Sequence, residues 1–235
     1  MNRVQLIGGA AIALLSLVPA QGAEAGSISY TLNTVFNNGP SPTSSSPWLT
    51  AEFTDVDSNN DTVFDYVALT LTASLEVASE FIDEVTFNVK PGVTPSSVTV
   101  TNTTLGNPIV TSIVGTTQNA QNLTGGGNDG KGFDFKISWE TSNSQGGVKR
   151  FNGVDVESFT FALTGLLSSD FDYTNTGGAN AHMAAHVQGI PGSTGSQSTA
   201  IKDGDSPFTV PDGGSTMTLL GSALLAVGML RRRLS

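Results

Sequence analysis

Residues 65–77 read DYVALTLTASLEV, and apolar and polar side chains alternate along the first part of this stretch. A period of two is typical of a β-strand that buries one face, because successive side chains point to opposite sides of an extended chain. β-Branched residues also favour strands, since their side chains pack well on a pleated surface. The stretch therefore predicts a half-buried strand, with its inner face formed by Val67, Leu69 and Leu71.

The same alternation recurs on both sides of this stretch, and turn residues separate the runs. The alternating runs cover residues 27–36, 47–54, 84–90, 96–102, 107–115, 132–140, 158–165 and 181–189. The weakest element is EVASEFIDEV at residues 76–85, which is compatible with one helical turn. About nine strands without intervening helices predict an all-β fold, an antiparallel β-sandwich of jelly-roll type.

Composition limits the class of protein. The 235 residues carry a formal charge of −10 and include no cysteine. Four of the ten basic residues lie in the terminal segments, and residues 26–210 contain the other six Lys and Arg against 18 Asp and Glu. Such a surface repels nucleic acid, which binds to clustered cations. The absence of cysteine excludes disulfides and thiolate chemistry, so a hydrophobic core has to stabilise the fold.

The N-terminus has the three parts of a secretory signal peptide. Arg3 gives a positive start, residues 6–18 form an apolar stretch, and Pro19 is followed by small residues. Ala23-Glu24-Ala25 fits the A-x-A cleavage pattern, so we predict that signal peptidase cuts after Ala25. Cleavage after Ala20 or Ala23 and an uncleaved membrane anchor are the alternatives.

The C-terminus reads VPDGGSTMTLLGSALLAVGMLRRRLS from Val210 to Ser235. The stretch between Met217 and Leu230 has no charge and is short for a membrane span, which needs about 20 apolar residues. Basic residues that follow a span stay on the cytoplasmic side. We therefore predict a short transmembrane helix that halts the exported chain in the inner membrane, with a cytoplasmic cluster formed by Arg231, Arg232 and Arg233.

A brief motif, a short span and a terminal basic cluster, in this order, resemble the PEP-CTERM class of sorting signals in its VPDSG variant. The residues that match the motif are Val210, Pro211, Asp212, Gly213 and Gly214, with Gly214 departing from the Ser-Gly order of the variant. The resemblance implies that a membrane protease-transpeptidase, an exosortase, cuts the chain at the motif. A plain C-terminal anchor is the alternative.

These segments give a predicted domain organisation. Residues 1–25 form the signal peptide, 26–189 the β-sandwich domain, 190–209 a flexible Gly/Ser/Thr-rich linker, and 210–235 the sorting signal. The predicted protein is exported, held transiently in the inner membrane, and then passed to the cell surface or the extracellular matrix.

An acidic cluster, DVDSNNDTVFDY, begins at Asp55. Asp55, Asp57, Asn59 and Asp61 occupy positions 1, 3, 5 and 7 of a calcium-binding loop, where oxygen ligands suit a hard cation. Position 6 is Asn60 instead of glycine, position 12 is Tyr66 instead of glutamate, and no helices flank the loop. The alternative is a polar turn between two strands. No other cofactor is predicted.

Three further features have both a functional and a structural interpretation. His182 and His186, the only histidines, have a spacing compatible with a zinc pair but lack a third ligand. The segment from Gly125 to Phe135 resembles one glycine- and aspartate-rich calcium repeat, or a turn that enters a strand. Trp48 and Trp139 are candidates for stacking on sugar rings, or core residues.

The sorting signal leads us to predict a non-enzymatic, exported surface or matrix protein, and no combination of acid, base and nucleophile can be named for an enzyme. Its expected partners are signal peptidase, an exosortase-type enzyme and extracellular polysaccharide. The alternative is a carbohydrate-binding β-sandwich module, with or without calcium. A hydrolase ranks last.

Overall fold

The computed structural model describes residues 25–75, 79–192, 195–204 and 208–209. The predicted signal peptide and the predicted transmembrane helix lie outside these residues. Every strand pair in the described part is antiparallel, which confirms the predicted all-β antiparallel class. The strands are β1 (Ser27–Val35), β2 (Leu49–Val56), β3 (Tyr66–Ala73), β4 (Phe81–Phe87), β5 (Thr99–Asn102), β6 (Val110–Gly115), β7 (Gln121–Asn122), β8 (Lys131–Phe133), β9 (Phe135–Trp139), β10 (Val156–Ala162), β11 (Met183–Gly192), β12 (Gly195–Asp203) and β13 (Phe208–Thr209).

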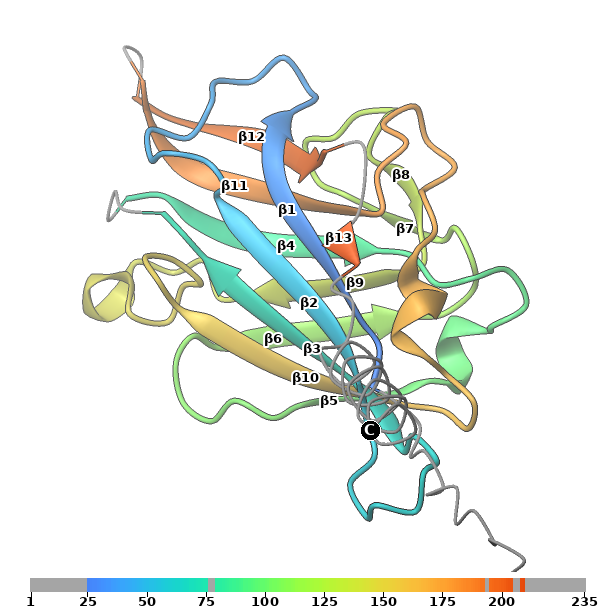
Figure 1. Cartoon of the computed structure of the whole chain (residues 1–235). Coiled ribbons are helices and arrows are strands. Elements are labelled where there is room, and N and C mark those ends of the chain that lie inside the picture. Colours follow the sequence, from blue (N-terminus) through green and yellow to red (C-terminus); the bar gives the residue numbers. More distant parts are fainter. Residues whose placement is uncertain (1–24, 76–78, 193–194, 205–207, 210–235) are drawn as a thin grey trace, which may run out of the picture.

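Ten of these strands follow one hydrogen-bonded path, in the order β5-β10-β3-β2-β1-β12-β11-β4-β9-β6. The path folds over on itself, so that β2, β3 and β10 cross in front of β4, β9 and β6 (Figure 1). Strands β1 and β12 pair with each other and join the two layers. The layers therefore belong to one continuous sheet that resembles a flattened, nearly closed barrel, instead of the two separate sheets of a simple sandwich.

The core lies between the two layers and is rich in phenylalanine. The rings of Phe53 on β2 and Phe87 on β4 contact across the interior, with centroids 5.5 Å apart. Phe135 on β9 and Phe161 on β10 make a second edge-to-face contact at 5.6 Å. Aromatic pairs in this geometry stabilise a core beyond the burial of their area. The predicted inner face of β3 is also buried, as the sequence pattern requires.

The predicted flexible linker at residues 190–209 is wrong in the part that the structure describes. Strand β12 occupies residues 195–203 and is hydrogen-bonded to β1 on one side and to β11 on the other. Two of its buried residues are polar: Thr199 donates a hydrogen bond to Asn37 Oδ1 at 2.9 Å, and Asp203 accepts a bond from the Met183 amide on β11. The pairing of these polar groups inside the fold explains why the strand lacks an apolar period.

The predicted helical turn at residues 76–85 is also not formed in its described part, because β4 begins at Phe81. The helical elements among the described residues are three short 3-10 turns, η1 (Pro95–Ser97), η2 (Ser144–Gly147) and η3 (Ser168–Phe171). No helix in the described ranges is long and apolar enough to cross a membrane.

Candidate functional site

The loop between β2 and β3 contains three of the four predicted calcium ligands, and their side chains hold the loop itself. Asp57 accepts hydrogen bonds from the amides of Asp61 and Thr62, at 3.2 and 2.8 Å. Asn59 accepts one from the Asp61 amide at 2.9 Å, and Asp61 accepts one from Val63. Bonds of this kind close Asx turns. The side-chain oxygens of this loop therefore accept hydrogen bonds from the loop's own backbone amides.

The fourth predicted ligand, Asp55, does not take part in this loop. Its two carboxylate oxygens accept hydrogen bonds from the amides of Gly26, at 3.2 Å, and Ser168, at 2.5 Å. The predicted set of four calcium ligands is therefore wrong at Asp55, because strand alternation directs this side chain into the fold. Within the described ranges, no group of three or more His, Asp and Glu side chains is placed to hold a metal ion.

The two histidines lie on β11 or at its start, and each binds a different carboxylate. His182 Nδ1 is 2.7 Å from Asp203 Oδ2, and its Nε2 is 3.2 Å from Asp172 Oδ1. His186 Nδ1 is 2.8 Å from Asp83 Oδ1. The structure thus places the histidines in two separate clusters, and the paired zinc site is not formed.

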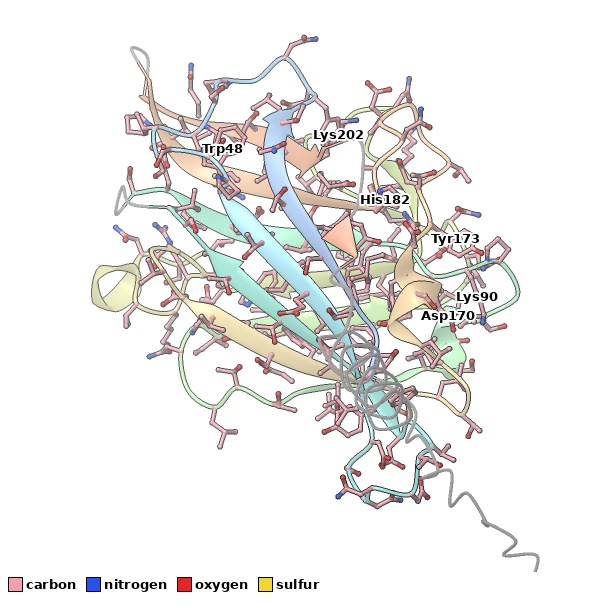
Figure 2. The ribbon with its side chains drawn as sticks, in the orientation of Figure 1. Trp48, Lys90, Asp170, Tyr173, His182 and Lys202 are labelled. Atoms are coloured by element: carbon pink, nitrogen blue, oxygen red, sulfur yellow. The ribbon has the colours of Figure 1, made fainter. Side chains whose placement is uncertain are left out.

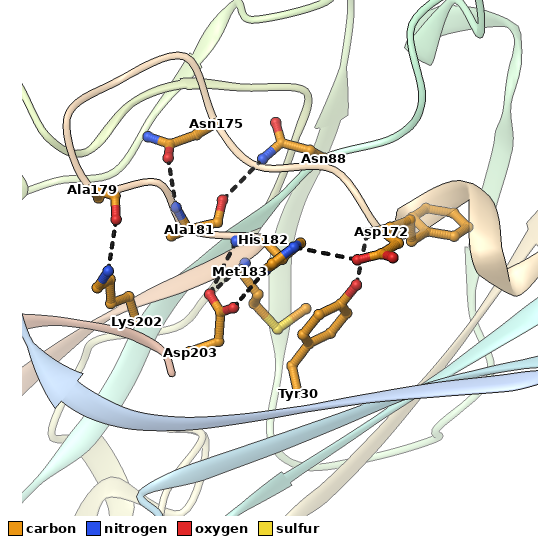
Figure 3. A network of polar contacts seen from close by, with 11 residues as sticks. Tyr30, Asn88, Asp172, Asn175, Ala179, Ala181, His182, Met183, Lys202 and Asp203 are labelled. Atoms are coloured by element: carbon orange, nitrogen blue, oxygen red, sulfur yellow. Dashed lines mark hydrogen bonds and ion pairs between the residues drawn. The ribbon is translucent and has the colours of Figure 1, made fainter. Parts of the chain in front are cut away.

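The His182 cluster is a polar network at the end of β12 (Figure 3). Asp203 Oδ1 also accepts the amides of His182 and Met183, and the imidazole stacks on the Tyr30 ring with centroids 5.2 Å apart. The hydrogen bond to the Asp203 carboxylate raises the pKa of His182, against the opposing effect of burial. Burial raises the pKa of Tyr30, whose hydroxyl donates to the Phe171 carbonyl at 3.0 Å. The network ties β1, β11, β12 and η3 together.

The His186 cluster lies under the glycine-rich turn that the sequence singled out. A β-bulge in the pairing of β4 with β11 lies at this point, between His186 and Val187. A side-chain carbon at Gly125 would lie 3.0 Å from His186 Nε2, and Gly125 has a φ of +74°. Both facts favour glycine at this position, so the segment forms a close-fitting turn over β11.

Both tryptophans belong to the core. Trp48 is 6% exposed and donates a hydrogen bond to the Ser44 carbonyl at 2.8 Å. Trp139 is 2% exposed and stacks on Phe151 with centroids 4.8 Å apart. Neither ring is available to stack on a sugar, which removes the two contacts predicted for carbohydrate binding.

The two ends of the described domain lie side by side. Strand β13 pairs with the start of β1, where Thr209 is opposite Ile28 and Phe208 is opposite Ser29. β13 ends one residue before Val210, the first residue of the predicted motif. The predicted cleavage point after Ala25 is only three residues before Ile28. The segments predicted to be removed therefore leave the domain from the same place.

The sorting residues themselves, Val210–Gly214 and Arg231–Arg233, lie outside the described residues. Residues 209–234 match the family described as the VPDSG-CTERM motif. This match confirms the predicted PEP-CTERM-like segment at the C-terminus. No curated protein and no solved structure matches the chain.

Two features of the domain were missed by sequence reasoning. Glu157 on β10 has no exposed surface, although glutamate is almost never fully buried without a partner. Its Oε2 accepts a hydrogen bond from Asn102 Nδ2 at 3.1 Å, while its Oε1 has no partner among the described residues. Burial raises the pKa of Glu157 to about 7, and the nearby Asp155 adds to this effect. One glutamate in a strand of alternating polarity does not indicate from the sequence that its side chain is buried.

The second missed feature is a small cavity of about 100 Å³ beside η3. Amide and hydroxyl side chains line it, and Tyr173, 41% exposed, lies at its rim and projects from the surface (Figure 2). The residues that line the cavity are Asn88, Val89, Pro91, Gln118, Asn119, Asp134, Tyr173, Thr174 and Thr176. They come from distant parts of the chain, so only the tertiary structure brings them together.

Proposed function

We propose that this chain is an exported bacterial surface or matrix protein, sorted by an exosortase-type enzyme that cuts at Val210–Gly214. The match of residues 209–234 to the VPDSG-CTERM motif carries this proposal. A signal peptide at residues 1–25 starts export, and a short transmembrane helix holds the chain until it is cut. Arg231–Arg233 keep the C-terminus on the cytoplasmic side. The mature product is the β-domain with a new C-terminus close to Thr209.

The position of β13 supports this order of events. Because β13 pairs with β1 next to the N-terminal cleavage point, the folded domain presents both processing points from one place. An enzyme embedded in the membrane can then reach the motif without opening the core. Removal of residues beyond the motif leaves the ten-strand path intact, since all of its strands end by Asp203.

We further propose that the domain is not an enzyme. His182 supports this, because both of its ring nitrogens contact carboxylates, at 2.7 and 3.2 Å, and neither is left to activate a nucleophile. Turnover of any envelope polysaccharide by the purified protein would contradict this part of the proposal.

Mass spectrometry of the protein from the surface of its own host tests the sorting proposal. We expect a C-terminus at or near Val210–Gly214 and no peptide that contains Arg231–Arg233. A matched variant, Asp212→Asn with Pro211→Ala, should accumulate as uncut chain in the membrane fraction. A surface protein with an intact arginine tail would show that the segment is a plain anchor.

Carbohydrate binding is the second candidate, and the cavity beside Tyr173 favours it. Amide side chains bind sugar hydroxyls, and an exposed aromatic ring can stack on a sugar face. The site differs from the one that the sequence suggested, because Trp48 and Trp139 are buried. Binding of matrix polysaccharide that is lost in Tyr173→Ala and retained in Trp48→Phe would support it. Equal binding by wild type and Tyr173→Ala would refute it.

A further inference from the structure

Asp55 is a buried carboxylate whose hydrogen-bond partners are backbone amides. It is 6% exposed and accepts hydrogen bonds from the amides of Gly26 and Ser168. The ion pairs found within the described ranges join other residues, and none includes Asp55. A carboxylate taken out of water needs compensation by hydrogen bonds or by a cation. In the unprocessed chain, the described surroundings of Asp55 supply hydrogen bonds and no cation.

Two reciprocal hydrogen bonds between Gly26 and Asp55 hold the Gly26 nitrogen next to this carboxylate. Gly26 N donates to Asp55 Oδ2 at 3.2 Å, and the Asp55 amide donates back to the Gly26 carbonyl at 2.9 Å. A side-chain carbon at residue 26 would lie 2.9 Å from Asp55 Oδ2 and 3.3 Å from Ser168 Oγ. A residue without a side chain is therefore required for this close approach.

Gly26 is also the first residue after the predicted signal-peptide cut. Hydrolysis of the bond between Ala25 and Gly26 adds water across the amide, leaves a carboxylate on Ala25 and frees the Gly26 nitrogen as an amine. An α-amine has a pKa of about 8 and takes up a proton at neutral pH. Ala25 is exposed, so the cut removes no buried group. Processing thus changes a neutral amide donor into a cation at the same position.

We propose that the new N-terminal ammonium group of Gly26 is bound by Asp55, as an ion pair that forms only after signal-peptide removal. The site binds the α-ammonium group of an N-terminal residue that has no side chain, which is glycine. It links β1, β2 and η3, because the other oxygen of Asp55 holds Ser168 at the start of η3. The inference rests on the proposed export, and it adds that processing stabilises the folded domain.

The test compares two forms of the chain that end at Ser235 and are purified in detergent. One starts at Gly26 after removal of a leading tag, and the other keeps Ala25 in front. Urea unfolding should give a folded-to-unfolded ratio about tenfold higher for the Gly26 form, because the donor gains a full positive charge beside a carboxylate that already accepts its hydrogen bond. Asp55→Asn should abolish this difference. Glu52→Gln, at an exposed position on the same strand, should retain it.

Equal stability of the two wild-type forms would overturn the proposal, as would a difference that persists in Asp55→Asn. If Asp55→Asn does not fold, the Gly26 form with an acetylated N-terminus replaces it, since acetylation removes the cation and leaves Asp55 in place. The acetylated form should match the form that keeps Ala25.

The N-terminus of the protein exported by its host separates this proposal from the sorting proposal. A start at Gly26 supports the ion pair, and a start at Gln21 or Glu24 overturns it. Neither result bears on the C-terminal cut, which is read from the other end of the same protein.

Discussion

Glu157 gives the sharpest prediction about the stability of this domain. Its side chain is fully buried on β10, and one carboxylate oxygen has no partner among the described residues. Burial raises its pKa from 4.5 to about 7, so the folded protein keeps the proton where the unfolded chain has lost it. Between these pH values the folded state binds more protons than the unfolded state. The free energy of unfolding must therefore fall as the pH rises.

The size of the fall follows from the two pKa values. Each pKa unit is worth about 1.4 kcal/mol, so the contribution that is fully present below pH 4.5 decreases by roughly 3 kcal/mol once the pH exceeds 7. Glu157→Gln replaces the carboxyl group with a neutral amide of the same shape. We expect this variant to match the wild type near pH 4.5 and to be more stable by roughly 3 kcal/mol at pH 8.

Urea unfolding at several pH values between 4.5 and 8 measures this effect. The matched control is Glu52→Gln, which removes a carboxylate from an exposed position on β2 and leaves Glu157 in place. The control should keep the wild-type fall between pH 4.5 and 7. A Glu157→Gln variant whose stability falls as steeply as that of the wild type would refute the reasoning, because the fall would then come from another group.

Two further predictions concern β12 and the network at its end. Ile201→Ala should destabilise the protein by about 2–4 kcal/mol because Ile201 is fully buried. The control Ser198→Ala, at an exposed position on the same strand, should cost under about 0.5 kcal/mol. Equal effects of the two variants in urea unfolding would mean that this segment is a linker after all. The imidazole of His182 should titrate above pH 6.5 by NMR because Asp203 favours its charged form, so its stabilising contribution is complete below pH 6.5 and is lost as the pH rises through the higher pKa of the folded state. Asp203→Asn should lower the titration midpoint, and a wild-type midpoint at or below 6.5 would contradict the assignment.

The strands that could be predicted are those whose buried face is apolar. The alternation in residues 65–77 led to β3, and comparable patterns led to β1, β2 and β11 with small shifts at their ends. β12 could not be predicted in this way, because two of its inward groups are Thr199 and Asp203. Their burial is possible only because Asn37 and His182, from distant segments, supply hydrogen bonds.

The candidate sites show the same difference between what a local sequence pattern reveals and what contacts in the folded chain decide. The calcium pattern in residues 55–61 depends on spacing alone, and spacing does not reveal that strand alternation turns Asp55 inward while Asp57 and Asp61 close a turn. Trp48 and Trp139 are a second example. Tryptophan is a residue type that suits a sugar site, but the burial of both side chains, which the sequence does not show, rules out stacking on a sugar.

The sequence by itself determined the all-β class and the C-terminal sorting segment, because each depends on the local order of residues along the chain. The tertiary structure decided how the strands close into one folded sheet and which polar groups are buried. It also paired β13 with the start of β1, so that the two ends of the described domain are neighbours. These properties depend on groups far apart in the sequence, such as Gly26 with Asp55 and Asn102 with Glu157, which meet only when the long-range pairing of the strands is complete.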